Sequence, residues 1–189
     1  NQSIIRKEEK QMLFKNLATE RLLLKNISTE DREFIFDHFS HPKVTEYLYD
    51  EEPLSDISGA DEIINVYLEP EPRTQHRWIL VTKDGEKIGT CGFHCWYMRQ
   101  GICDVGYDLR PEYEGKGYMR EALETIIQFA FEEMNIKKIN ACIYINNDRS
   151  SNLAKRLGFK FSGETENCLF REKEYLHNIY SLENSKVSE

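Results

Sequence analysis

The sequence predicts a mixed α/β (α+β) domain in which helices flank one central sheet. Segments with strand-like alternation are interleaved with segments whose apolar residues recur at helical spacing. No internal repeat or low-complexity linker divides the 189 residues, a length that suits one domain with a full-sized core. We expect that domain to span residues 12–184, with a polar, frayed leader over 1–11 and a short tail over 185–189.

Composition and charge exclude several classes of protein. Hydrophobic residues make up 40% and charged residues 31% of the chain, which indicates a globular protein. No apolar run could span a membrane and no signal-peptide pattern is present, so we expect no membrane contact and a cytoplasmic location. The net charge of −8 argues against nucleic-acid binding. It fits a cationic substrate such as an amine, although acidity that merely keeps the protein soluble is the commoner explanation.

The 5 cysteines are odd in number and contain no C-x-x-C pair. Most fall in strand-like segments, where a free cysteine packs as a small hydrophobic side chain. This pattern indicates a reducing compartment and no metal.

The N-terminal half is expected to contain three strands and a group of helices. Turn residues and capping residues mark where these elements begin and end. The strands are expected at 19–25, 76–82 and 87–98, the helices after Ser28 or Thr29 and at 42–48 and 59–68, and an acidic, aromatic loop at 47–56.

The C-terminal half alternates between strands and helices. A long helix carries an apolar stripe that includes Met119, Leu123 and Ile126, and Gly158 ends a shorter helix. The strands are expected at 103–109, 138–145, 159–165 and 168–182, and the shorter helix at 148–157.

Gly115 and Gly117 stand where the strand at 103–109 passes through a turn into the long helix. Glycine allows positive φ and close approach of a ligand, and the first N–H groups of a helix attract negative charge, so this is a phosphate site or else an ordinary turn. A P-loop is excluded because Gly117, not a hydroxyl residue, follows Lys116. A dinucleotide fingerprint is excluded because Arg120 replaces its third glycine. A pyrophosphate cradle of another kind remains.

The stretch Glu114–Met119 resembles motif A, [QR]-x-x-G-x-[GA], of the GNAT superfamily of acetyl-CoA-dependent N-acetyltransferases, in its RimJ/RimL-type branch. Glu114 and Met119 depart from that pattern. The T-E-R-L-L-L-K opening, the W-I-L-V-T-K-D-G-E-K-I-G-T-C-G-F hairpin and the N-D-R-S-S-N…K-R-L-G-F segment are similar to family segments in the same order. The resemblance covers nearly all of the chain. It implies the GNAT fold, a mostly antiparallel twisted sheet of about seven strands that is splayed at the acetyl-CoA site.

The resemblance also implies where acetyl-CoA binds. The strand 104–109 would leave its neighbour at a bulge near Gly106, and the N–H of Leu109 would polarise the acetyl carbonyl. Asn147 would hold the pantetheine arm, or else cap the next helix. The pyrophosphate would lie on the amides of Glu114, Gly115, Lys116, Gly117, Tyr118, Met119 and Arg120.

The catalytic acid and base remain open between several residues. The Tyr that many relatives use to protonate the leaving thiolate is replaced by Ala154, so Ser150 or Ser151 would substitute, or would only cap a helix. Asp104 and His94 are the candidate bases, against a purely structural carboxylate and a packed histidine. We expect the acceptor pocket across the sheet from CoA, near the acidic loop and near His94, Trp96 and Tyr97.

The scarcity of an obvious base favours an acceptor of low pKa. At pH 7 an α-amino group of pKa about 7.8 is roughly a tenth neutral, whereas a lysine amine of pKa about 10.4 is neutral to only about 0.04%. We therefore expect an acetyl-CoA-dependent N-acetyltransferase whose acceptor is a protein or peptide N-terminus. A small amine such as a polyamine, amino sugar or antibiotic, and a non-catalytic CoA sensor, are the alternatives. Whether the protein is a homodimer stays open.

Overall fold

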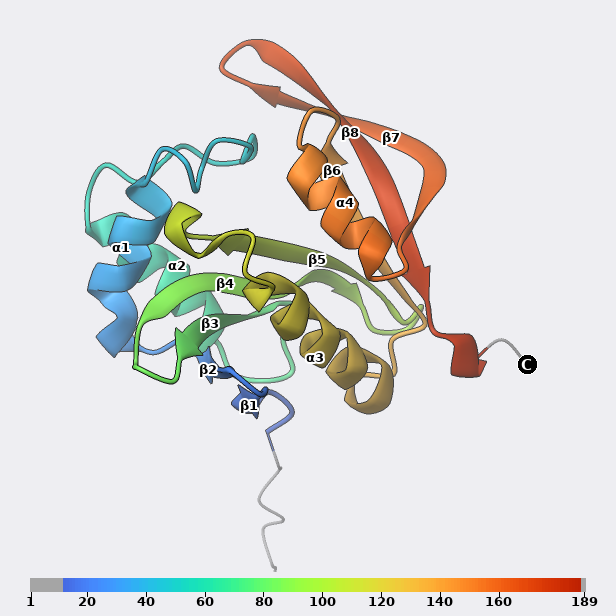
Figure 1. Ribbon diagram of the computed structural model, residues 1–189, viewed down its shortest axis with the longest axis horizontal. Coiled ribbons are helices and arrows are strands. Elements are labelled where there is room, and N and C mark those ends of the chain that lie inside the picture. The colour runs from blue at the N-terminus through green and yellow to red at the C-terminus, as the bar shows by residue number, and fades with distance from the viewer. Residues whose placement is uncertain (1–11, 188–189) are drawn as a thin grey trace, which may run out of the picture.

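The computed structural model describes residues 12–187, and its centre is an eight-stranded sheet (Figure 1). The strand order is β1-β2-β3-β4-β5-β6-β8-β7, and only the β5–β6 pair is parallel. The strands are β1 (Leu17–Ala18), β2 (Leu22–Asn26), β3 (His76–Thr82), β4 (Lys87–Tyr97), β5 (Ile102–Leu109), β6 (Lys138–Tyr144), β7 (Lys160–Phe170) and β8 (Lys173–Glu183). The mixed, mostly antiparallel sheet that the sequence predicts is confirmed. The leader expected at 1–11 and the last residues of the tail, 188–189, lie outside the described residues.

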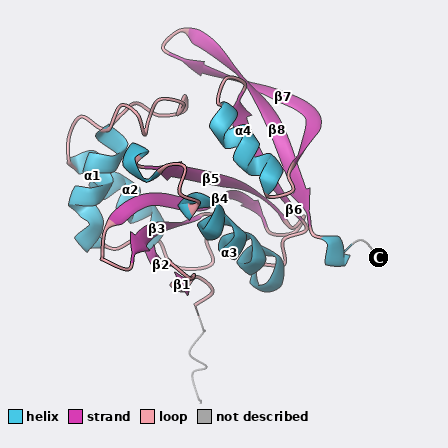
Figure 2. Cartoon of the chain, in the orientation of Figure 1, coloured by secondary structure: helices cyan, strands magenta, loops and turns pink. Residues whose placement is uncertain are grey.

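Helices cover both faces of this sheet (Figure 2). The helix α3 (Tyr118–Glu133) packs through Leu123, Ile126 and Ala130 into the larger core cluster, while Phe34 and Ile35 belong to a smaller cluster on the other face. None of the helices within residues 12–187 is long and apolar enough to cross a membrane. The α-helices are α1 (Arg32–Ser40), α2 (Ser58–Leu68), α3 (Tyr118–Glu133) and α4 (Asp148–Arg156), and the 3-10 turns are η1 (Thr29–Asp31), η2 (Pro111–Tyr113) and η3 (Ser185–Val187).

The strands β5 and β6 separate soon after they meet. They pair only at Ile102↔Lys138, Cys103↔Ile139 and Asp104↔Asn140, although β5 continues to Leu109 and β6 to Tyr144. From Ala141 to Tyr144, β6 pairs with β8 on its other side. The sheet is therefore splayed between β5 and β6, as the resemblance implies.

Alternation along β5 sends its side chains to opposite faces. Asp108 contacts His38 of α1, whereas Tyr107 contacts Ser150 of α4. Asp104, Gly106 and Asp108 therefore face the α1/α2 side, and Cys103, Val105 and Tyr107 face the α3/α4 side.

Three expectations about local structure are wrong. Residues 42–48 form successive turns and no helix, because the short segment contains β-branched Val44 and Thr45 and is held by turn hydrogen bonds such as Leu48 N to Thr45 O, 3.1 Å. The final hairpin turns at Arg171 and Glu172, which have φ of 50° and 62°, and not near residue 167. The β4–β5 register is continuous through Gly106, and its irregularity lies between His94 and Tyr97.

Candidate active site

The gap between β5 and β6 is lined by main-chain groups of β5. Arg110 N donates to Ile88 O at 2.8 Å, which fixes the phase of the β4–β5 ladder. Because hydrogen-bonded and non-hydrogen-bonded pairs alternate in an antiparallel ladder, Leu109, Tyr107 and Val105 point their N–H groups away from β4. These amides are therefore directed toward the side where β6 has moved away.

The Gly-rich turn that follows β5 leads directly into α3. Gly115 and Gly117 have φ of 72° and 80°, and Gly117 is the N-cap of α3. Positive φ is the reason for glycine here, since a Cβ on Gly115 would meet no atom within 4 Å. The turn presents the unpaired N–H groups of the first turn of a 16-residue helix, which is an arrangement that binds phosphate.

The turn is held from behind by the segment that opens the domain. Arg21 Nη1 donates to Lys116 O at 3.0 Å, Arg21 Nε donates to Glu121 Oε1 at 3.2 Å, and Thr19 Oγ1 donates to Glu121 Oε2 at 2.7 Å. The guanidinium of Arg21 also lies 4.4 Å from the centre of the Tyr118 ring. The T-E-R opening therefore fixes the cradle, a role that the sequence did not indicate.

The unusual acidic residue of the turn, Glu114, has a cationic partner. Its carboxylate pairs with Arg149 in the first turn of α4. The pair joins the Gly-rich turn to α4 and compensates the negative charge that Glu114 brings beside a phosphate site.

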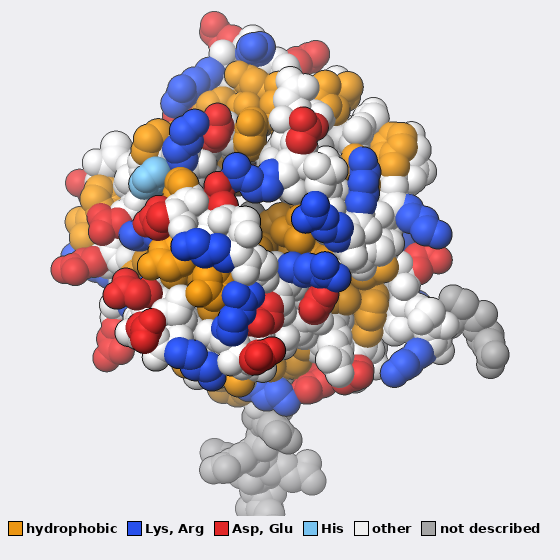
Figure 3. Space-filling view, viewed as in Figure 1, with side chains coloured by type: hydrophobic (Ala, Val, Ile, Leu, Met, Phe, Trp, Pro, Cys, Tyr) orange, Lys and Arg blue, Asp and Glu red, His pale blue; other side chains and the backbone are white. Residues whose placement is uncertain are grey.

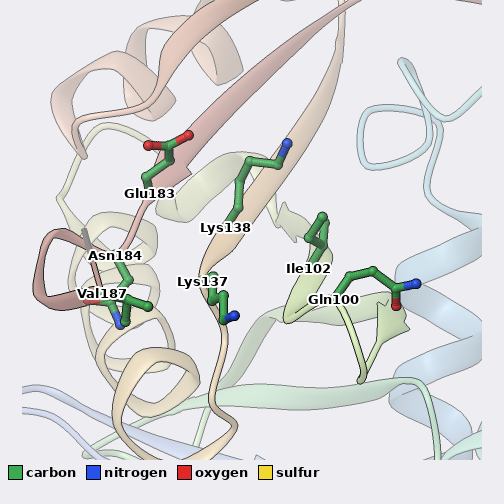
Figure 4. Close-up of a pocket in the computed structure, with 7 residues that line it drawn as sticks. All are labelled: Gln100, Ile102, Lys137, Lys138, Glu183, Asn184 and Val187. Atoms are coloured by element: carbon green, nitrogen blue, oxygen red, sulfur yellow. The ribbon is translucent and has the colours of Figure 1, made fainter. Parts of the chain in front are cut away.

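The surface on this side is hollowed between α3 and α4, and lysine and arginine side chains surround the hollow (Figure 3). In a chain of net charge −8, this local basic fringe suits a polyanionic ligand. A separate pocket lies near the start of β5 and β6 and the end of β8 (Figure 4). It is lined by Ile102, at the opposite end of β5 from Leu109, so it is not part of this site.

The first turn of α4 faces the gap with two serines in different environments. Asn147 is the N-cap, and its side-chain oxygen accepts from Ser150 N at 3.2 Å. Ser151 Oγ donates to Asp148 O at 3.1 Å within the helix. Ser150 Oγ instead lies 2.8 Å from the hydroxyl of Tyr107 on β5. Of the two serines, Ser150 is the one whose hydroxyl points toward the splayed strands.

On the α1/α2 side, the two candidate bases lie together. His94 Nε2 is 4.0 Å from Asp104 Oδ2. Burial, helped by the charge of Glu166 and opposed by the Asn140 side chain, raises the pKa of Asp104 to about 6. Burial and the positive charge of Arg77 lower the pKa of His94. At neutral pH the pair is a carboxylate beside a neutral imidazole.

Cys95 joins this pair because it has φ of 48° at the irregularity in β4, and donor atoms of His94, Cys95 and Asp104 all lie within 4.8 Å of one another. Such donors also occur in metal sites, so the expectation that no metal is required stays a prediction.

The expected acceptor side is formed by the acidic loop and the β7–β8 hairpin. Tyr49 of the loop stacks on Tyr175 of β8 with ring centres 3.7 Å apart, and it meets the edge of Tyr144 at 5.0 Å. Arg171 Nε at the hairpin tip donates to Glu52 Oε1 at 2.8 Å. Trp96 does not belong to this side, because it packs with Phe14 against the larger core cluster.

Comparison with known proteins agrees with this geometry. The family model described as an acetyltransferase (GNAT) domain matches residues 21–160, which is most of the chain. The chain belongs to the GNAT acetyltransferase family. The uncharacterized N-acetyltransferase YoaA of Bacillus subtilis (strain 168) is 30% identical over 174 residues, which cover 90% of this chain and 97% of YoaA.

Solved structures show the same GNAT fold. A spermidine N-acetyltransferase from Vibrio cholerae, in complex with CoA and spermine, has a TM-score of 0.77 at 19% identity and covers 87% of this chain and 96% of its own. A protein from Vibrio cholerae that is provisionally named a ribosomal-protein-serine acetyltransferase has a TM-score of 0.76 at 18% identity, covering 92% and 100%. The GNAT chain described here is thus an N-acetyltransferase by family, and its resemblance to the GNAT superfamily is confirmed. Its acceptor is not determined by these similarities.

Proposed function

We propose that this GNAT protein transfers the acetyl group of acetyl-CoA to the N-terminal α-amino group of a protein or peptide. The observation that carries the proposal is the gap between β5 and β6. The cradle and the first turn of α4 lie on one side of the sheet at this gap, and Asp104 and His94 lie on the other. A thioester held in the gap could therefore be attacked from the opposite face.

Acetyl-CoA would bind along the α3/α4 side. The pyrophosphate would accept hydrogen bonds from the amides of residues 115–120, where both glycines have positive φ. The expected Glu114 amide is not among them, because its N–H already donates to Pro111 O at 3.2 Å. Asn147 accepts the Ser150 N–H with its oxygen as the cap of α4, and its amide nitrogen would donate to the pantetheine arm.

The position of the reacting carbonyl follows from distances along β5. Strands rise about 3.3 Å per residue, so Leu109 lies roughly 16 Å from Asp104 and Tyr107 roughly 10 Å. The Asp104 carboxylate can accept a proton through one or two waters from an amine near Tyr107, but not from one near Leu109. We therefore assign the acetyl carbonyl to the N–H of Tyr107 and the pantetheine arm to the N–H of Leu109. The proposed donor to the acetyl carbonyl is thus Tyr107, two residues before the Leu109 that the resemblance implies.

The acceptor amine would lose its proton to Asp104 through water. A base with a pKa of about 6 is well matched to an α-ammonium group of pKa about 7.8 and poorly matched to a lysine ammonium of pKa about 10.4. His94, which is 4.0 Å away, would orient the carboxylate and the water. After attack, the hydroxyl of Ser150 would donate a hydrogen bond to the departing sulfur.

A second acceptor class is a small polycationic amine. Asp50 and Glu166 are close enough to Cys168 that their charges, after burial, help to raise the pKa of its thiol. Carboxylates and tyrosine rings on one face could bind a second ammonium group. The fold similarity to a spermidine N-acetyltransferase is consistent with a polycationic acceptor.

The test is release of free thiol from acetyl-CoA by purified protein with N-terminal peptides, polyamines or aminoglycosides, and with no acceptor. We expect peptide-dependent release that is unchanged by EDTA, and mass spectrometry of the peptide should place the acetyl group on its α-nitrogen. Release with polyamines alone would replace the peptide by the second class. Acetyl-CoA binding without release in any reaction would favour a CoA sensor and overturn the proposal.

A further inference from the structure

The hydroxyl of Tyr107 connects β5 to the first turn of α4. Its oxygen lies 2.8 Å from Ser150 Oγ and 3.3 Å from the carbonyl oxygen of Ser150. The ring packs against the larger core cluster, and burial raises the pKa of the hydroxyl to about 12 although the Ser150 hydrogen bond opposes this. Tyr107 is therefore a neutral phenol at pH 7, with one proton to donate.

The position of Ser150 limits the hydrogen-bond partners of its hydroxyl. Its main-chain N–H donates to Asn147 Oδ1 at 3.2 Å, which fixes the residue in the cap of α4. Within residues 12–187, the Ser150 hydroxyl is hydrogen-bonded to the Tyr107 hydroxyl, whereas Ser151 Oγ donates to Asp148 O inside the helix. If Tyr107 donates to Ser150 Oγ, the serine proton is directed away from Tyr107 and toward the gap between β5 and β6.

We infer that Tyr107 is a positioning residue, whose hydroxyl aims the Ser150 proton at the sulfur of the departing CoA. The inference rests on the proposed function, because it needs a thioester in the gap between β5 and β6. It adds a residue that the motifs did not indicate, on the strand whose N–H groups line the gap.

The step balances without a further reactant. The acceptor nitrogen attacks the carbonyl carbon, a C–N bond forms, the C–S bond breaks and its electron pair goes to sulfur. Ser150 stabilises this charge by an O–H···S hydrogen bond, and the bond from Tyr107 strengthens it because hydrogen bonds in a chain polarise one another. The proton that finally neutralises the sulfur is the one that the amine releases.

Tyr107 does not itself give up a proton. Its pKa is about 12, whereas an ordinary thiol has a pKa of about 8.5, so a thiolate does not take the proton of this phenol. The Tyr107→Phe change therefore removes polarisation and orientation while it keeps the ring in the core.

The test is a double-mutant cycle on the wild type, Y107F, S150A and the double variant. The measured quantity is the single-turnover rate of CoA release at saturating acceptor. We expect S150A to lower this rate about tenfold and Y107F about fivefold, with KM for acetyl-CoA within twofold of wild type. In the S150A background, Y107F should have no further effect, because its effect passes through Ser150.

A matched control is Tyr180→Phe, a buried tyrosine of β8 in the same core cluster. It should leave the rate unchanged, and thermal melting should show all variants folded. Equal effects of Y107F with and without Ser150, or no effect of S150A, would overturn the inference while thiol release by wild type still supports the proposed function. Absence of acceptor-dependent release by wild type would overturn both.

Discussion

Asp104 is a side chain whose charge changes close to neutral pH. Burial raises its pKa to about 6, so the carboxylate that accepts a proton is lost as the pH falls below that value. We expect kcat/KM to fall about tenfold per pH unit below 6 in wild type. Asp104→Asn should lower kcat about 100-fold near pH 7 and abolish this acid limb. The measurement is the pH–rate profile of thiol release.

Stability provides the control for this substitution. Because the pKa of Asp104 is raised from 3.8 to about 6 in the folded state, the free energy of unfolding falls as the pH rises between these two values and stays lower above about pH 6. Removing the charge in Asp104→Asn should therefore leave the melting temperature at pH 7 equal or higher. Asp84→Asn, in the exposed β3–β4 turn, should change neither activity nor stability. An acid limb that persists in Asp104→Asn would place the base elsewhere.

At the scale of single residues, the sequence indicated chemistry better than contacts. Asp104, Gly115, Gly117 and Asn147 each lie in a segment with its own local strand, turn or helix signal, so the sequence could place each of them in its element. Arg21 and Tyr107 reach their partners Lys116 and Ser150 across 95 and 43 residues of chain. Such contacts depend on which strands become neighbours, and periodicity does not reveal that. Alternation along β5 places Tyr107 on the face opposite to Asp104, but it does not reveal that α4 lies on that face.

Among the elements, the turn between β5 and α3 combines a strained conformation with the cradle. Gly117 has φ of 80°, and a Cβ there would lie 3.3 Å from Arg21 Nη2. We expect Gly117→Ala to raise the Kd for acetyl-CoA at least tenfold, because the amides that face the pyrophosphate must shift. Isothermal titration with acetyl-CoA measures this.

Gly85 offers a matched control for backbone strain. It has φ of 86° in the β3–β4 turn, with no atom within 4 Å of a Cβ. Both Gly117→Ala and Gly85→Ala should lower the free energy of unfolding by about 1 kcal/mol, since both place alanine in the left-handed region. Only Gly117→Ala should weaken acetyl-CoA binding. Equal affinities of Gly117→Ala and Gly85→Ala for acetyl-CoA would show that the pyrophosphate does not bind at this turn.

The elements that were mispredicted lack strong local signals. The segment 42–48 has no capping box or sustained apolar stripe, and it becomes a set of turns that carry Tyr47 to Tyr144 of β6. The β7–β8 hairpin turns at Arg171 and Glu172 although neither is a usual residue at positive φ. The pairing of β7 with β8 from Thr165 to Phe170 continues up to this turn, so the position of the turn follows from the strand register and not from the turn residues.

At the scale of the whole molecule, a buried charged network fastens the α1/α2 layer to the sheet beside the site. Asp108 of β5 lies 2.5 Å from His38 Nε2 of α1 and 3.1 Å from Arg77 Nη1 of β3, and it accepts from Thr90 of β4 at 2.7 Å. Burial alone would raise the pKa of Asp108, but the charges of His38 and Arg77 and the hydrogen bonds hold it below its usual value. This network lies next to Leu109, so it also fixes the end of β5 at the gap.

Removing Asp108 should destabilise the fold much more than removing an exposed ion-pair partner. The side chains of Asp108 and Arg77 are 7% and 17% exposed, so Asp108→Ala leaves the charge of Arg77 nearly buried and without its ionic partner. We expect the free energy of unfolding, measured with urea, to fall by about 3–5 kcal/mol. Asp61→Ala breaks the pair with Arg32, whose side chains are 44% and 46% exposed, and should cost less than about 1 kcal/mol. Because the folded-state pKa of Asp108 is lowered, its contribution is present above the usual value of 3.8 and is lost as the pH falls through the lower one. The difference in the free energy of unfolding between wild type and Asp108→Ala should therefore narrow as the pH falls below 3.8. Equal losses in Asp108→Ala and Asp61→Ala would show that the network does not hold the layers together.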